Sequence, residues 1–100
     1  MTARWIPIRY REFYDVPRAF VTTHEGRTFL FDCTFSEELD EYLAEYAVYR
    51  LGDEIRDGID SISWKGISEG LERVGTIPVA AVVFDATKRA SISADVFDLL

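Results

Sequence analysis

Residues 18–35 read RAFVTTHEGRTFLFDCTF, and this stretch decides the fold. Its second half alternates between two sets of side chains, a period of two that is typical of a β-strand. Gly26 interrupts the pattern and can adopt a positive φ. We therefore predict that residues 18–23 and 27–35 pair as an antiparallel hairpin. One face of the second strand carries Phe29, Phe31, Cys33 and Phe35, and the other carries Thr28, Leu30, Asp32 and Thr34.

The register of this hairpin depends on the length of its loop. A three-residue loop over residues 24–26, with a glycine bulge, would place Val21 opposite Phe29. It would also place Thr22 opposite Thr28, so that like side chains pair, and we favour this register. A two-residue turn is the alternative.

A strand is also predicted before the hairpin, because residues 5–14 alternate between apolar and polar side chains. Pro7 cannot donate a ladder hydrogen bond, which indicates an edge strand or the start of a strand. The alternation slips over residues 12–14, where a β-bulge would restore the apolar face. Residues 15–17 are predicted to form a turn, since Pro17 favours an extended residue before it.

Helical spacing begins after the hairpin. Ser36 is a favourable N-cap residue, and Glu37 and Glu38 suit the positive end of a helix dipole. Residues 47–51 include β-branched and aromatic side chains and are predicted to form a strand. Residues 54–62 are predicted to be a loop with at most one helical turn. The apolar side chains of the predicted helix are Leu39, Tyr42, Leu43 and Tyr46.

Three elements are predicted in the C-terminal third. A helix over residues 64–74 would be capped by Ser63, and residues 79–84 would form a strand buried on both faces. Ser93 would cap a short final helix. The side chains expected to face inward from that helix are Val96, Leu99 and Leu100.

These elements predict an α+β fold in a single globular domain spanning residues 1–100. We expect an antiparallel sheet of about five strands with two or three short helices packed on it. A small, partly closed β-barrel is the main alternative.

Charge and composition exclude several classes of protein. The net charge is −7, and residues 28–63 carry ten acidic residues against two arginines. Such a chain repels phosphates, so we predict neither a nucleic-acid partner nor a membrane partner. A single cysteine and the lack of an N-terminal apolar stretch favour a cytoplasmic protein.

The residues needed for catalysis are not brought together. Cys33 and His24 are the only cysteine and histidine, and the hairpin separates them by roughly 20 Å. We expect Cys33 to be a buried thiol and His24 an exposed turn residue. Residues 66–70 (Gly-Ile-Ser-Glu-Gly) fit the Gly-x-Ser-x-Gly pattern, but no predicted strand precedes them as a nucleophile elbow requires, and the chain contains no phosphate-binding glycine loop. A calcium loop starting at Asp53 fails because Ile55 and Trp64 occupy ligand positions. We predict no cofactor and no metal, and an enzyme is less favoured than a binding module.

The predicted helix after residue 36 would carry a run of acidic side chains on one face, with two tyrosines beside it. A solvated face that favours solubility is the simplest interpretation. The functional interpretation is a docking face for a basic protein partner, because charge speeds the encounter and tyrosines anchor interfaces. The predicted partner-binding residues are Glu37, Glu38, Glu41, Tyr42, Glu45 and Tyr46.

The function predicted from the sequence is therefore a non-catalytic acidic module that docks on, and regulates, a more basic protein. Two other classes stay open. One is a small-molecule-binding or enzymatic domain with a site between the sheet and the predicted helix 64–74. The other is a structural subunit of a homo-oligomer formed through an exposed aromatic face of the sheet.

Overall fold

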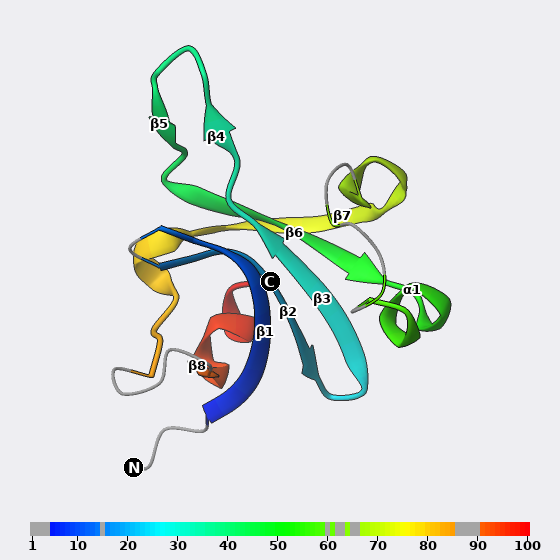
Figure 1. Cartoon of the computed structure of the whole chain (residues 1–100). Coiled ribbons are helices and arrows are strands. Elements are labelled where there is room, and N and C mark those ends of the chain that lie inside the picture. The colour runs from blue at the N-terminus through cyan, green and yellow to red at the C-terminus, as the bar shows by residue number, and fades with distance from the viewer. Residues whose placement is uncertain (1–4, 15, 60, 62–63, 65–66, 86–90) are drawn as a thin grey trace.

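The computed structural model describes residues 5–14, 16–59, 61, 64, 67–85 and 91–100. Its main feature is a six-stranded antiparallel sheet with the strand order β7–β6–β3–β2–β1–β8 (Figure 1). A separate two-stranded sheet pairs β4 with β5. The strands are β1 (Trp5–Tyr14), β2 (Val16–His24), β3 (Arg27–Asp32), β4 (Phe35–Ser36), β5 (Glu41–Tyr42), β6 (Glu45–Leu51), β7 (Glu72–Pro78) and β8 (Ser91–Ser93).

The architecture is mostly β rather than α+β, and the antiparallel sheet is open and has six strands where about five were predicted. Strands β7 and β8 lie at its two edges and are not paired with each other, so the barrel alternative is wrong for the described part of the chain. The helical elements are short, as predicted. They are α1 (Asp53–Asp57) and the 3₁₀ segments η1 (Ile67–Gly70), η2 (Val79–Ala81) and η3 (Ala94–Leu99).

The central hairpin of β2 and β3 is confirmed, but β3 ends at Asp32 rather than at residue 35, and the predicted register is wrong by one residue. Val21 lies opposite Leu30, and Phe20 lies opposite Phe31. The loop is a two-residue turn because Glu25 and Gly26 both adopt left-handed conformations, with φ of 52° and 77°. Two successive positive φ angles are what a type I′ hairpin turn requires. This register brings Phe20, rather than Val21, onto the face that carries the phenylalanines of β3.

Strand β1 agrees with its predicted features. Its pairing with β2 is irregular between Tyr10 and Phe13, which is the bulge that the slipped alternation indicates. Pro7 lies near the start of the strand, where the short edge strand β8 pairs with β1 only over Trp5–Pro7. Tyr14 pairs directly with Val16, and the predicted turn residue Asp15 lies outside the described residues.

The helix predicted to start at Ser36 is wrong. Its first half forms the β4–β5 hairpin, which is closed by Asp40 at a φ of 53°. Ser36 still accepts a hydrogen bond from the amide of Leu39 (3.2 Å), but inside a turn. The second half joins β6, because the alternating burial of β6 already begins at Glu45 and takes Tyr46 into the sheet. Helical spacing and strand alternation overlap here, and tertiary pairing selects the strand.

The helix predicted over residues 64–74 is wrong as well. Among the described residues of that range only η1 is helical, and residues 72–78 pair with β6 as β7. Ser63, the predicted cap, lies outside the described residues. The strand predicted over residues 79–84 is also wrong, since η2 follows Pro78 and the remaining pairing is a single bridge from Phe84 to Ile92.

The final helical segment is confirmed in position but is a 3₁₀ helix. Ser93 caps it by accepting a hydrogen bond from the amide of Asp95. Val96 is buried as predicted, whereas Leu99 and Leu100 are exposed, so their predicted inward orientation is wrong.

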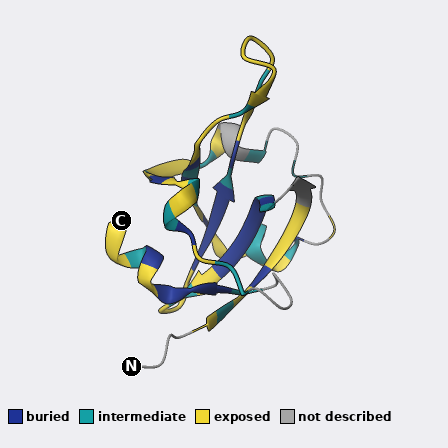
Figure 2. Ribbon diagram, turned by 90° about the vertical axis from the view of Figure 1, so that its left-hand side faces the viewer, coloured by how far each residue is buried: buried dark blue, intermediate teal, exposed yellow. Residues whose placement is uncertain are grey.

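Both faces of the sheet are covered, which explains why its central strands are buried (Figure 2). On one face, Phe20 stacks on Phe31 with ring centroids 4.6 Å apart, and Tyr46 meets both rings edge-on. The segment after β7 closes this core. The residues of that segment in the core are Val82, Ile92 and Val96.

A smaller core lies on the opposite face. Its buried residues are Val21, Leu30, Leu51 and Ile59. Trp64 packs against it and donates a hydrogen bond from Nε1 to the carbonyl of Ile59 at 2.8 Å. The guanidinium of Arg11 lies 4.9 Å from the Trp64 ring centroid. Apolar side chains therefore pack on this side of the sheet, near the predicted small-molecule site.

Candidate functional site

The predicted acidic residues are exposed, but they do not share a helix face. Glu37 and Glu38 lie in the turn between β4 and β5, and Glu41 lies in β5. Glu45 is the first residue of β6. The structure therefore places three of the four glutamates on one short hairpin and the fourth at its base.

Tyr46 is separated from this surface. It is fully buried, and its hydroxyl donates a hydrogen bond to the carbonyl of Pro17 at 2.6 Å. Burial raises the pKa of Tyr46 well above that of an exposed tyrosine. The residue is part of the core, so its predicted place on an exposed helix face is wrong.

The hairpin of residues 34–44, called the arm below, projects from the sheet (Figures 1 and 2). It carries three large apolar side chains that the rest of the chain does not cover. Their exposed fractions are 45% for Phe35, 60% for Leu39 and 38% for Leu43. The sequence does not indicate their exposure, because the predicted helix would turn the two leucines inward.

The base of the arm is fixed to the sheet by a network around Cys33. The amide of Leu43 donates to the carbonyl of Thr34 at 2.9 Å, and the Cys33 thiol donates to the carbonyl of Leu43 at 3.0 Å. Arg18 donates to Cys33 Sγ, and its guanidinium lies 4.6 Å from the ring centroid of Tyr42. The Tyr42 ring meets Phe35 edge-on at 5.1 Å. These contacts hold the base in place and leave the tip in solvent.

Cys33 is a structural thiol in this arrangement. It is buried, and burial raises its pKa more strongly than the neighbouring Arg18 lowers it. A raised pKa keeps the sulfur protonated, whereas a nucleophile needs the thiolate. His24 lies at the far end of β2 and β3, so the predicted separation of the two residues is confirmed. His24 itself is stacked on Phe97 (ring centroids 4.3 Å apart) and half-buried, so the prediction of an exposed turn residue is wrong.

A cleft of about 580 Å³ opens beside the arm. Asp40, Glu41 and the Phe35–Tyr42 pair line it, together with Arg18, whose guanidinium lies over the Tyr42 ring. The two carboxylates suit the cation of a lysine or arginine side chain, whereas the Tyr42 ring is already contacted by Arg18.

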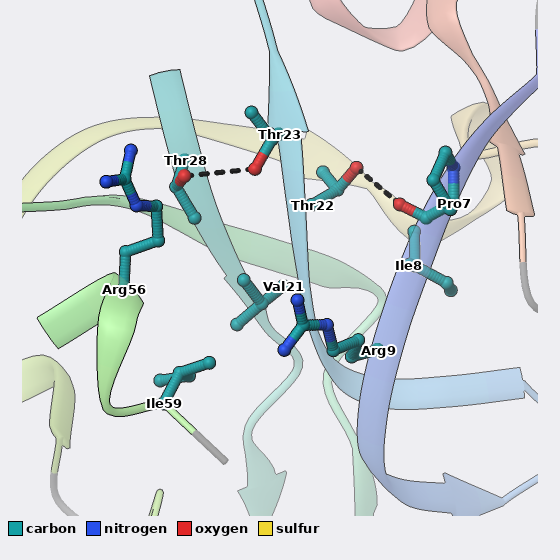
Figure 3. Close-up of a pocket in the computed structure, with 9 residues that line it drawn as sticks. All are labelled: Pro7, Ile8, Arg9, Val21, Thr22, Thr23, Thr28, Arg56 and Ile59. Atoms are coloured by element: carbon teal, nitrogen blue, oxygen red, sulfur yellow. Dashed lines mark hydrogen bonds between the residues drawn. The ribbon is translucent and has the colours of Figure 1, made fainter. Parts of the chain in front are cut away.

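A second cavity, of about 150 Å³, lies between α1 and the strands β1, β2 and β3 (Figure 3). Its hydroxyls are already hydrogen-bonded: Thr22 donates to the carbonyl of Pro7, and Thr23 and Thr28 bond to each other at 3.0 Å. Arg56 is paired with carboxylates of α1. Among the described residues that line this cavity there is no histidine or carboxylate that could act as a base toward a threonine.

The described ranges contain no group of three or more His, Cys, Asp or Glu side chains arranged to hold a metal ion. No helix among them is long and apolar enough to cross a membrane.

Comparisons with protein-family models, with curated proteins and with solved structures found no match for this chain. The function is therefore argued from the geometry of the arm and of the cavities.

Proposed function

We propose that this chain is a non-catalytic binding module that docks on a basic protein through the arm. The observation that carries the proposal is the exposure of Phe35, Leu39 and Leu43 on one projecting hairpin. Large apolar side chains that gather on a surface and are rimmed by charge are typical of protein interfaces.

Charge supports a basic partner. Residues 37–41 contain four acidic residues and no basic one, in a chain whose net charge is −7. An acidic projection raises the rate of encounter with a basic surface, and this gain falls as salt increases. A second copy of the same arm would be repelled, so the homo-oligomer alternative is less favoured for this surface.

The cleft beside the arm supports recognition of a lysine or arginine of the partner. Asp40 and Glu41 would pair with the cation and Phe35 would contact its stem, while Arg18 keeps its contact with the Tyr42 ring. Leu39, at the tip, would enter an apolar pocket of the partner and limit the dissociation rate. A cytoplasmic location belongs to the same proposal.

A photo-crosslinking amino acid placed at Leu39 tests this proposal in cell lysate. Val83 is the matched control position, because it is also an exposed apolar residue (55%) and lies outside the arm. We expect a discrete crosslinked protein of basic composition from position 39 and none from position 83. The same products from both positions would contradict docking through the arm.

Charge variants then test the mechanism with the crosslinked protein purified. The arm variant combines Glu37→Gln, Glu38→Gln and Glu41→Gln. The control combines Asp53→Asn, Glu54→Gln and Glu72→Gln, three exposed acids elsewhere, and it changes the net charge equally. We expect the arm variant alone to slow association and flatten its salt dependence. Equal effects of the two variants would mean that net charge, and not the arm, attracts the partner.

A further inference from the structure

The end of the sheet opposite the arm holds a cavity of about 390 Å³. The arm follows the last residue of β3, whereas this cavity surrounds the turn that precedes its first residue. Its walls come from the β2–β3 turn, the end of β6, the start of β7 and η3. The volume lies within the range of small-molecule sites.

Three nitrogen-bearing side chains meet on one face of the sheet at this cavity. Arg27 pairs with His24 across the β2–β3 turn, and Arg50 pairs with Phe29, two residues further along β3. Residues two apart on a strand share a face, so Arg27 and Arg50 are diagonal neighbours about 7–8 Å apart at the backbone. Both side chains line the cavity.

The two guanidinium groups are available to a ligand. Within the part of the chain that the structure describes, neither one makes a hydrogen bond or an ion pair, although Glu25 and Asp98 also line the cavity. The Glu25 carboxylate lies instead 3.7 Å from Nε2 of His24. Two arginines on one sheet face repel each other, and an anion bound between them would relieve that repulsion.

An apolar wall faces these cations. The His24 ring lies flat on Phe97, with an interplanar angle of 6°. Val74 and Leu100 line the same cavity and are both exposed. A bare inorganic anion would leave this wall in water, whereas an organic anion would cover it.

We infer that this cavity binds a small organic carboxylate. Its carboxylate group lies between Arg27 and Arg50, which match the planar two-oxygen geometry, and its apolar body lies against Phe97, Val74 and Leu100. The carboxylate of Asp98 disfavours a doubly charged phosphate ester in the same place. The inference is independent of the arm, since the two sites share no residue.

Benzoate and its uncharged isostere benzamide test the inference by NMR titration of backbone amides. We expect benzoate to shift the amides around the β2–β3 turn and η3, and to bind at least tenfold more tightly than benzamide. Arg27→Gln or Arg50→Gln should each weaken benzoate binding about tenfold. Asp98→Asn should strengthen it about twofold, because a like charge is removed.

Arg73→Gln is the control, because Arg73 is an exposed arginine of β7 that lies outside the cavity and is hydrogen-bonded to Thr76. It changes the net charge as Arg50→Gln does and should leave the benzoate affinity within twofold. Equal weakening by both variants, equal binding of benzamide, or no saturable shift with benzoate would overturn the inference. Tighter binding of phenyl phosphate than of benzoate would overturn the choice of a carboxylate.

Discussion

Two hairpins leave opposite ends of β3, and they differ in what they bury. In the β2–β3 hairpin, Phe20, Leu30 and Phe31 are almost completely removed from solvent. In the β4–β5 hairpin, the apolar side chains remain exposed although the backbone is paired in the same way. The two hairpins therefore differ in the burial of their apolar side chains, and not in hydrogen bonding or turn chemistry.

This difference in burial means that one hairpin contributes to the stability of the fold and the other to binding. Covering a large apolar side chain contributes about 1.5–3 kcal/mol. The β2–β3 hairpin gains that free energy within the chain, whereas the arm gains it only when another molecule covers its tip. Substitutions should consequently affect stability in one hairpin and association in the other.

The largest expected effect is on the free energy of unfolding. Phe31→Ala removes a ring that packs against Phe20 and Tyr46, and we expect a loss of about 3–5 kcal/mol in urea denaturation. Leu39→Ala, at the tip of the arm, should change stability by less than about 0.5 kcal/mol. A comparable loss from Leu39→Ala would show that the arm is part of the folding core.

Tyr46→Phe should have a smaller effect. It removes a buried hydroxyl and leaves the carbonyl of Pro17 without that donor, so we expect a cost of about 1–3 kcal/mol. Tyr42→Phe in the arm is the matched control and should cost less, because Tyr42 is half-buried. Urea denaturation of both variants measures the contrast. If the order is reversed, Tyr46 does not anchor β6 to the start of β2.

Alkaline pH should destabilise the sheet together with the base of the arm, and leave the tip of the arm unaffected. Burial raises the pKa of both Cys33 and Tyr46, so both groups hold their protons more tightly in the folded chain. The stability that they contribute is present below about pH 8.5 and is lost as pH rises through 8.5 and then above about 10. Cys33→Ala should reduce the first part of this decline and Tyr46→Phe the second, in denaturation measured at several pH values. An unchanged slope in both variants would contradict these assignments.

The smallest expected effect is in the two turns. Glu25 and Asp40 both adopt left-handed φ angles, which Gly and Asn tolerate better than Glu. Glu25→Asn should stabilise the fold by about 0.5–1 kcal/mol, because the β2–β3 turn closes the core hairpin. Asp40→Gly should leave the free energy of unfolding unchanged within error. Equal stabilisation by both variants would mean that the two hairpins fold as one unit.

The sequence predicts the core hairpin because period-two alternation runs without a break over residues 28–35. It does not predict the register, which depends on whether Glu25 accepts a left-handed conformation. Over residues 36–46 the sequence wrongly predicts a helix, because Tyr46 fits both the helical spacing of the preceding residues and the strand alternation of β6. The lesson is that local periodicity identifies an element only when a single period fits it.

The arm and the arginine-lined cavity could be predicted only in part, because local periodicity does not describe all the elements that form them. The four acidic residues of the arm, Glu37, Glu38, Asp40 and Glu41, are visible in the sequence, and all of them are exposed on the hairpin. The exposure of Leu39 and Leu43 follows from a tight turn that the pattern does not indicate. The approach of Arg27 to Arg50 depends on the β3–β6 register, a long-range pairing that no local pattern encodes.

Shortening the arm tests most directly whether it binds and does not fold. Replacing residues 36–41 with Asn-Gly keeps the Phe35–Tyr42 pair and the Cys33 network, and it removes the tip. We predict that the shortened chain keeps its free energy of unfolding within about 0.5 kcal/mol and no longer binds the protein crosslinked from position 39. Unchanged binding of that protein by the shortened, folded chain would contradict docking through the arm.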